Sequence, residues 1–195
     1  CVGYSVIQYY LDGETIGSLQ GHQGRHAQAE VIATFLPRIV VDSLGTALSE
    51  ADLTMDTLTL EPSAAMHVVV PPTMRMLNIA LVDVGAGTSD LAVSADGTVK
   101  GYGMVAYAGD AITKGLADHF LLDFKVAEKV KVELRPDEIS TCQDVFGNTL
   151  HLAYEDVLAV IKPRVEILAE KIAQEIIKLN GGPPKGAIII GGGSR

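Results

Sequence analysis

An acidic residue beside a glycine-rich turn is the arrangement in this sequence that could do chemistry. Asp83 stands near the end of the apolar run Ile79 to Val84, and Gly85-Ala86-Gly87-Thr88 follows that run. Glycines carry no Cβ, so backbone N–H groups in such a turn can approach phosphate oxygens closely. A carboxylate at the end of the run can hold a cation through water. The turn therefore predicts a phosphate site, although an ordinary hairpin with an acidic residue at its shoulder explains the pattern equally well.

Two better-known glycine loops do not match this turn. A P-loop needs Lys followed by Ser or Thr after its second glycine, and a dinucleotide fingerprint opens a helix after its turn. Here the residues from Asp90 to Val93 alternate as a strand does. The expected element is a strand, a glycine turn and a returning strand, which together must position Asp83.

The composition predicts a folded protein that does not bind nucleic acids. Of the 195 residues, 48% are hydrophobic, which is enough to bury a core, and we expect one domain with a smaller additional piece. The formal net charge of −9 and the absence of a Lys/Arg run argue against a nucleic-acid footprint. Cys1 and Cys142 form no metal or disulfide pattern, which favours the cytoplasm. No apolar run approaches the ~20 residues that a membrane helix needs.

The region before the glycine turn predicts a small α+β subdomain over residues 1–55. Its expected elements are strands at 2–11, 14–19 and 29–35 and a helix that begins at Pro37. A short strand at 57–60 is expected next. A helix should then begin near Glu61 and Pro62, where an acidic residue and a proline both suit the first turn.

The region after the turn predicts a mixed sheet with helices. Its expected elements are a strand at 99–106, a helix opened by Gly109, a helix at 125–132, two weak strands within 139–152, a long helix through 157–176 and a strand at 187–190. Pro163 should kink the long helix or mark a junction. Glu128 and Lys131 are i, i+3 neighbours, for which a surface ion pair is one explanation. The element order predicts three antiparallel strands extended by parallel ones.

Four motifs in a fixed order resemble those of the actin-like ATPase superfamily. The matching segments are LEPSAA (60–65), DVGAGTSD (83–90), AGDAIT (108–113) and IIIGGGSR (188–195). They are similar to the superfamily's first connecting motif, its second phosphate loop, the glycine-acid pair beside the nucleotide and the adenosine loop. The resemblance implies an α/β fold, namely an actin-like ATPase (ribonuclease H-like) lobe with a mixed sheet plus a small α+β inserted subdomain. It also implies ATP and magnesium as cofactors.

Within the superfamily the sequence most resembles the FtsA family, through residues 9–35 and the segment AEKVK (127–131). The PilM family of pilus-assembly proteins shares that layout. The resemblance divides the chain into an inserted subdomain (1–55), the tail of the first lobe (56–78) and a C-terminally truncated second lobe (79–195). The superfamily binds ATP between two lobes that each supply a phosphate hairpin. Because the sequence shows only the second hairpin, we expect a piece of a longer protein that binds ATP weakly and is inactive alone.

The resemblance also assigns roles to individual residues. Asp83 would organise magnesium through water, and Glu61 would position the attacking water near that metal. The terminal phosphates would contact Gly85, Ala86, Gly87 and Thr88. The residues beside the ribose and base would be Gly109, Glu128 and Lys131, and Asp110 would also lie beside the nucleotide. The adenosine loop would comprise Gly191, Gly192, Gly193 and Arg195.

The function implied by the resemblance is that of an FtsA-type, ATP-binding scaffold in bacterial cell division. It would assemble with itself and recruit partners under nucleotide control, with at most slow ATP hydrolysis in the full-length parent. The expected location is the cytoplasm or the inner face of the membrane, reached through parts absent from this chain. Two alternatives remain, a PilM-like pilus-assembly protein and an actin-fold chaperone or reactivase-type ATPase that acts on a substrate protein.

Overall fold

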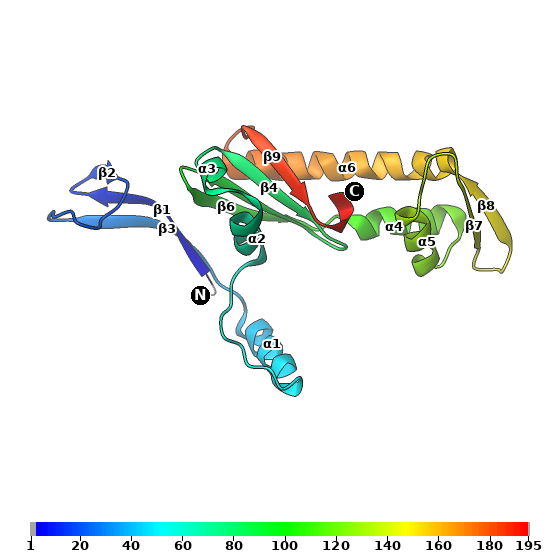
Figure 1. Cartoon of the computed structure of the whole chain (residues 1–195), viewed down its shortest axis with the longest axis horizontal. Coiled ribbons are helices and arrows are strands. Elements are labelled where there is room, and N and C mark those ends of the chain that lie inside the picture. The colour runs from blue at the N-terminus through cyan, green and yellow to red at the C-terminus, as the bar shows by residue number, and fades with distance from the viewer. Residues whose placement is uncertain (1–2, 195) are drawn as a thin grey trace. The chain divides into compact units, whose positions relative to one another are not determined.

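The computed structural model describes residues 3–194 (Figure 1). Its strands are β1 (Gly3–Leu11), β2 (Glu14–Ile16), β3 (Ala27–Thr34), β4 (Ile79–Val84), β5 (Ser89–Ala95), β6 (Thr98–Val105), β7 (Ile139–Gln143), β8 (Thr149–Ala153) and β9 (Gly186–Ile190). Its helices are α1 (Arg38–Glu50), α2 (Glu61–Val69), α3 (Pro72–Arg75), α4 (Gly109–Phe120), α5 (Phe124–Val132), α6 (Tyr154–Asn180) and the short 3-10 helix η1 (Gly192–Ser194).

The chain divides into two compact units. The first holds the described residues up to Leu81, together with Ala92–Tyr102 and Pro183–Ile188. The second holds Val82–Leu91, Gly103–Gly182 and the described residues from Ile189 onward. The three-part division at residues 55 and 78 that the sequence suggested stays a prediction.

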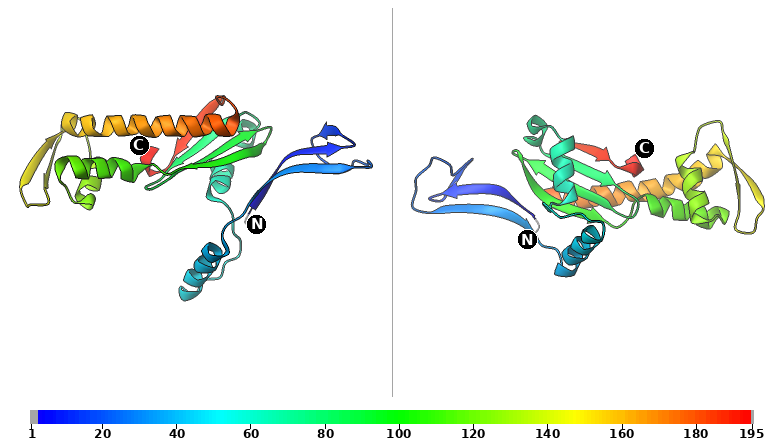
Figure 2. Two further views of the ribbon diagram at one scale, coloured as in Figure 1. Left: turned by 180° about the vertical axis from the view of Figure 1, so that it is seen from behind. Right: turned by 60° about the horizontal axis from the view of Figure 1, so that its bottom comes forward.

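A three-stranded antiparallel sheet of order β2-β1-β3 begins the first unit. Asp12 (φ 50°) and Gly13 (φ 90°) form the turn between β1 and β2, and positive φ at both positions is what a two-residue type I′ hairpin loop requires. The predicted hairpin is confirmed, and α1 follows Pro37 as expected. The strand predicted at 57–60 is wrong, because that segment pairs with no other strand of residues 3–194, and β propensity alone does not form a strand. Two further views show β1 and β3 side by side (Figure 2).

A four-stranded sheet of order β6-β5-β4-β9 carries the glycine turn. Short turns join β4, β5 and β6, which makes these strands antiparallel neighbours. Strand β9 runs parallel to β4, since Lys185 N–H donates to the Asn78 carbonyl oxygen at one end (2.8 Å) and Gly191 packs on Val84 at the other. The predicted mixed sheet is therefore confirmed. Nearly all side chains of β4 and β5 are buried, so the turn between them stands on a rigid base.

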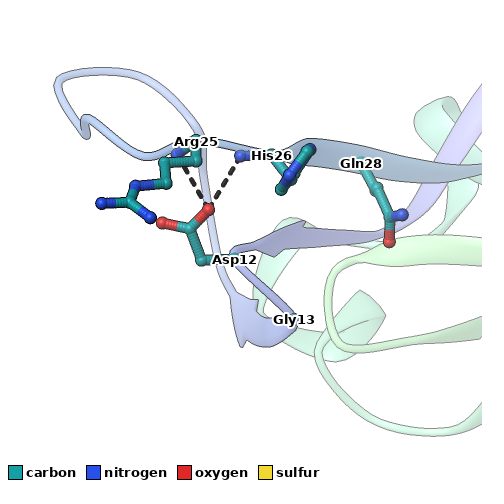
Figure 3. Close-up of a pocket in the computed structure, with 5 residues that line it drawn as sticks. All are labelled: Asp12, Gly13, Arg25, His26 and Gln28. Carbon is teal, nitrogen blue, oxygen red and sulfur yellow. Dashed lines mark hydrogen bonds between the residues drawn. The ribbon is translucent and has the colours of Figure 1, made fainter.

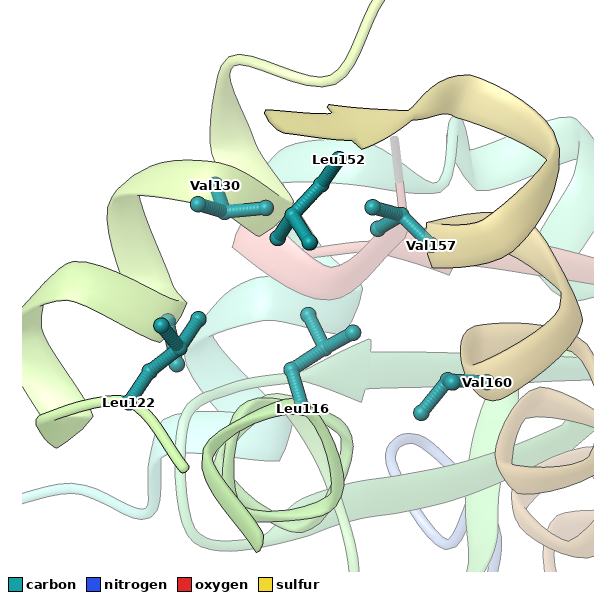
Figure 4. Close-up of a cluster of buried hydrophobic side chains, with 7 residues drawn as sticks. Leu116, Leu122, Val130, Leu152, Val157 and Val160 are labelled. Carbon is teal, nitrogen blue, oxygen red and sulfur yellow. The ribbon is translucent and has the colours of Figure 1, made fainter. Parts of the chain in front are cut away.

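The helices of the second unit pack around a cluster of seven buried apolar residues (Figure 4). These come from α4, α5, β8, α6 and the link after α4: Leu116, Leu122, Ala127, Val130, Leu152, Val157 and Val160. Leu121 ends α4 in the left-handed region (φ 54°), and the Asp123 carboxylate caps α5 by accepting from Lys125 N–H (2.9 Å). This packing fixes α5 against α4.

Helix α6 continues without a break through Pro163 (Figure 2), so of the two expectations there the junction is wrong and the kink stays a prediction. Proline lacks an N–H and disturbs the preceding turn of a helix. The guanidinium of Arg164 donates from Nη1 to the Val160 carbonyl oxygen (2.7 Å) in that turn, whereas the carbonyl whose helical donor Pro163 removes is that of Ala159. Gly181 then ends the helix with φ 72°. Among the described residues, no helix has the length and apolar character needed to span a membrane.

Candidate functional site

The glycine turn at the end of β4 presents two main-chain donors to open space. Gly85 N–H donates to the Thr88 carbonyl oxygen (3.0 Å), which closes the turn. Ala86 and Gly87 are exposed, and no acceptor within residues 3–194 takes up the N–H of either one. A Cβ built on Gly87 would meet no heavy atom within 4 Å. Free N–H groups on an unobstructed turn are suited to binding anionic oxygens.

The N-terminus of α4 is joined to this turn by main-chain hydrogen bonds. Gly109 N–H donates to the Gly85 carbonyl oxygen (3.1 Å), and Asp110 N–H donates to the Ala86 carbonyl oxygen (2.7 Å). These are N–H groups of the first helical turn, which have no acceptor inside the helix. Glycine at 109 suits this approach, since a Cβ would lie 3.2 Å from the Gly85 oxygen and would push the turn by a few tenths of an ångström. The turn and the helix are thereby fixed to each other.

Glu128 and Lys131 of α5 face the start of α4. Their Oε2 and Nζ atoms lie 2.7 Å apart, which confirms that the two are i, i+3 partners. The pair is more than a surface contact, because Lys131 Nζ also donates to Thr113 Oγ1 (2.7 Å) and to the Gly109 carbonyl oxygen (3.2 Å). Burial raises the pKa of Glu128, but hydrogen bonds from Lys131 and Thr113 and the charge of Lys131 outweigh it and hold that pKa below its ordinary value.

The glycine-rich loop after β9 packs on the end of β4. Gly191 has φ 90°, and a Cβ there would lie 2.8 Å from the Val84 carbonyl carbon and still closer to the Asp83 carboxylate. A Cβ on Gly193 would lie 3.2 Å from the Val84 oxygen, whereas Gly192 faces open space. Ser194 closes the loop by donating from Oγ to the Gly191 carbonyl oxygen (2.7 Å). The loop therefore lies beside Asp83.

The second unit thus brings most of the predicted site residues together through this series of contacts. They are Asp83, Gly85, Ala86, Gly87, Thr88, Gly109, Asp110, Glu128, Lys131, Gly191, Gly192 and Gly193. Glu61 belongs to the first unit, where it is the exposed first residue of α2. Arg195 lies outside the described residues.

One buried polar residue in this region, Thr113, was not predicted as a site residue from the sequence. Thr113 has no exposed surface, and its Oγ1 is hydrogen-bonded to Glu128 Oε2 and lies 3.1 Å from the Gly109 carbonyl oxygen one helical turn earlier. No local pattern marks this residue, since the charged partners that make it important lie 15 and 18 residues further along the chain.

Asp83 is the acidic residue available for a cation beside the turn. Its side chain is half-buried, and its carboxylate accepts no hydrogen bond from residues 3–194. Asp90 differs, because it accepts from Thr88 Oγ1 (3.3 Å). In the described part of the chain, no group of three or more His, Cys, Asp or Glu residues could hold a metal ion. A single carboxylate fits magnesium that is carried by phosphate oxygens and water, which is how this ion commonly binds.

A separate open hollow of about 520 Å³ lies in the first unit (Figure 3). Its lining residues are Asp12, Gly13, Arg25, His26 and Gln28, and all five are exposed. Asp12 Oδ1 accepts from the backbone N–H groups of Arg25 and His26, both at 2.8 Å, so its carboxylate braces the loop between β2 and β3. The hollow is therefore formed by the β1–β2 turn and the braced loop, and we assign it no ligand.

The sequence is similar to cell division proteins of the FtsA family. Residues 80–152 match the family model described as cell division protein FtsA. The chain is 28% identical over 182 residues to the cell division protein FtsA of Escherichia coli strain K12, covering 88% of this chain and 43% of that protein. It is also 28% identical over 173 residues to FtsA of Buchnera aphidicola subsp. Baizongia pistaciae, covering 88% and 41%. The chain thus spans less than half the length of these curated relatives.

The fold of this chain is similar to the folds of several solved structures. A chain of the PilM–PilN type IV pilus biogenesis complex aligns with a TM-score of 0.67 at 21% identity, covering 91% of this chain and 47% of that one. MreB5 of Spiroplasma citri bound to ADP aligns with a TM-score of 0.64 at 16% identity, covering 82% and 55%. At these identities the likeness concerns the fold alone.

Proposed function

We propose that this chain, which has an actin-like ATPase fold close to that of FtsA, supplies one side of an ATP site in a bacterial cell-division scaffold. One observation carries the proposal. The free N–H groups of Ala86 and Gly87 stand beside the unpaired carboxylate of Asp83, at a turn fixed to the start of α4. Donors already held in place lose little freedom when an anion binds.

The turn would hold the terminal phosphates. The N–H groups of Ala86 and Gly87 would donate to phosphate oxygens, and Thr88 is exposed beside them. Asp83 would orient water molecules around magnesium, and the metal, when bound, would neutralise charge on the phosphates. Thr88 already donates to Asp90, which suggests that Asp90 maintains the turn and does not contact the ligand.

Glu128 and the glycine loop would hold the nucleoside. The Glu128 side chain remains 42% exposed although its Oε2 is paired, so its other oxygen can accept from a sugar hydroxyl. Gly192 faces open space and would leave room for a flat base. Both groups are joined to the phosphate turn, Glu128 through Lys131 and Gly109, and the loop through its packing on Val84.

The role in cell division is supported by the FtsA likeness, and nucleotide binding is supported by neighbours of the same fold. MreB5 of Spiroplasma citri has been solved with ADP and with AMPPNP. In the proposed role, nucleotide would govern assembly with further copies of the protein and with division partners at the cytoplasmic face of the membrane. Any hydrolysis would be slow.

An NMR titration of this chain with magnesium-ATP tests the proposal, because it detects weak binding residue by residue. Amide signals of Gly85 to Thr88, Gly109 and Gly192 should shift together. Asp83→Asn should weaken binding in the presence of magnesium and change it little in its absence. In the matched variant Asp90→Asn, the difference between ATP binding with and without magnesium should change less than in Asp83→Asn. Absence of shifts at the turn, or equal losses in both variants with intact spectra, would contradict the proposal.

A second candidate is a PilM-like role in pilus assembly. It is favoured by the alignment of 91% of this chain with the PilM–PilN complex structure. The sequence comparisons favour division, since residues 80–152 match the FtsA family model and the chain is 28% identical to E. coli FtsA. Deleting the gene separates the two roles, because a division block supports the first and loss of pili with normal division supports the second.

A further inference from the structure

The hydroxyl group of Thr113 lies at the centre of the contacts between α4 and α5. Thr113 is fully buried on α4. Its Oγ1 accepts from Lys131 Nζ at 2.7 Å, and it is also hydrogen-bonded to Glu128 Oε2 and lies 3.1 Å from the Gly109 carbonyl oxygen. A buried hydroxyl that touches both members of an ion pair can decide how that pair is oriented.

The number of protons on Lys131 Nζ and Thr113 Oγ1 determines which of these hydrogen bonds can exist at the same time. Lys131 has three N–H donors, and they match its three acceptors, namely Gly109 O, Thr113 Oγ1 and Glu128 Oε2. Thr113 has one hydroxyl proton, which goes to the stronger, charged acceptor on Glu128. Lys131 is then saturated, and Glu128 Oε2 is held by two donors.

The other oxygen of Glu128 is left free by this arrangement. Within residues 3–194, Oε1 of Glu128 accepts no hydrogen bond, and the side chain is 42% exposed. The Lys131 side chain is only 19% exposed. Of the two, Glu128 is therefore the group that can reach a ligand, whereas Lys131 acts on Glu128 from behind.

We propose that Thr113 is a positioning residue which, with Lys131, fixes the Glu128 carboxylate so that Oε1 accepts from a ribose hydroxyl. This rests on the proposed ATP-binding function and adds to it the way in which the nucleoside is recognised. A carboxylate held in one orientation loses less side-chain freedom on binding than a mobile one.

The same threonine also links the nucleoside side of the site to the phosphate side. Its neighbour Gly109 accepts from Lys131 through its carbonyl and donates through its N–H to Gly85 of the glycine turn. The main-chain bonds to the turn do not involve the hydroxyl of Thr113. Removing that hydroxyl should therefore weaken nucleoside binding and leave the phosphate turn intact.

Two substitutions separate the hydroxyl from the bulk of the side chain. Thr113→Val keeps the shape and removes the hydroxyl, whereas Thr113→Ser keeps the hydroxyl and removes a methyl group. The probes are adenosine, inorganic tripolyphosphate and magnesium-ATP, each titrated by NMR into the full chain. Thr98→Val is a matched control, since Thr98 Oγ1 donates to the Ala95 carbonyl oxygen (3.3 Å) and meets no charged partner.

Thr113→Val should weaken adenosine and ATP binding about tenfold, which corresponds to one charge-assisted hydrogen bond, and leave tripolyphosphate binding unchanged. Thr113→Ser and Thr98→Val should bind all three probes as the wild type does. The side-chain signal of Glu128 should also titrate at higher pH in Thr113→Val. If Thr113→Val fails to fold, Lys131→Gln should give the same loss for adenosine.

Three results would overturn the inference. Normal adenosine binding by folded Thr113→Val would show that the hydroxyl positions nothing. A loss in Thr113→Ser with none in Thr113→Val would assign the residue to packing. A wild-type chain that responds to tripolyphosphate and not to adenosine would refute the nucleoside site while leaving the phosphate turn. A wild type that responds to none of the probes would instead refute the proposed function itself.

Discussion

The guanidinium group of Arg164 in α6 lies against the backbone of Gly115 in α4, in the space that a Cβ on residue 115 would fill. Arg164 also donates to the Val160 carbonyl oxygen, in the helical turn disturbed by Pro163. The missing side chain at 115 therefore lets the arginine serve both contacts between these helices.

Gly115→Ala should lower the free energy of unfolding, although alanine is the better helix former by about 1 kcal/mol. The new methyl group would displace Arg164 and break its hydrogen bond, which is worth about 0.5–1.5 kcal/mol, as well as its packing on α4. In an Arg164→Ala background, the same change should raise the free energy of unfolding. Denaturant melts of the four proteins give the coupling, expected at about 0.5–3 kcal/mol.

Gly45→Ala in α1 is the control, since a Cβ there meets only Met55 Cε at 3.9 Å. It should be neutral or stabilising. A coupling near zero between positions 115 and 164 would refute the account of this contact.

Gly191→Ala and Gly192→Ala should separate stability from ligand binding. At Gly191, φ is 90° and a Cβ would strike the backbone of Val84, so the free energy of unfolding should fall by about 1–3 kcal/mol or more. At Gly192 a Cβ meets nothing within 4 Å, so stability should stay within about 0.5 kcal/mol. Adenosine binding should nevertheless weaken in Gly192→Ala. Equal melting temperatures for the two variants would contradict this assignment.

Acid should remove the contribution of the Glu128–Lys131 pair. The pKa of Glu128 lies below its ordinary 4.5 in the folded state, so its stabilising effect is present above about 4.5 and is lost as pH falls through the lower folded-state value. The stability difference between wild type and Lys131→Met should therefore be constant from about pH 7 to pH 5 and shrink below that. Urea melts across this range measure it. If the stability difference between wild type and Lys131→Met persists at low pH, the stabilisation comes from packing of the Lys131 side chain and not from its ion pair.

The turn between β7 and β8 depends on Asp144. A hydrogen bond from the Asn148 side chain, with backbone N–H groups of Asn148, Phe146 and Gly147, holds the pKa of Asp144 below its ordinary value against the opposing effect of burial. Asp144→Ala should speed amide hydrogen exchange at Phe146 and Asn148, whose N–H groups now donate to Oδ1 (2.9 and 2.8 Å). Asp118→Ala, an exposed change on α4, should leave both rates unaltered.

Local sequence pattern was sufficient for the elements whose partners lie nearby in the chain. The strand pair around the glycine turn and the helix opened by Gly109 follow from alternation and glycine placement, and both are present. The strand expected at 57–60 failed because pairing depends on a distant partner that its sequence does not specify. The junction expected at Pro163 did not form, because α6 buries residues on both sides of the proline, such as Val160 and Leu168, and the local pattern does not show what they pack against.

The site residues also divide into those that the local sequence shows and those that depend on distant contacts. The acidic residue, the glycines and the Glu128–Lys131 spacing were visible as motifs. Thr113 was missed, because its importance arises only when α5 packs on α4 and brings Lys131 within 2.7 Å of its hydroxyl. The role of the Gly109 backbone was equally hidden, since main-chain hydrogen bonds leave no residue type as a signature.

The connection between the glycine turn and α4 is made by main-chain atoms at both ends. Alanine scanning would therefore not detect it, since no side-chain truncation at Ala86 or Asp110 removes either bond. Replacing the amide of Asp110 by an ester, through chemical ligation, would delete a single donor and leave every side chain in place. By the same logic, positions 86 and 110 can accept many residue types without detaching the turn from the helix.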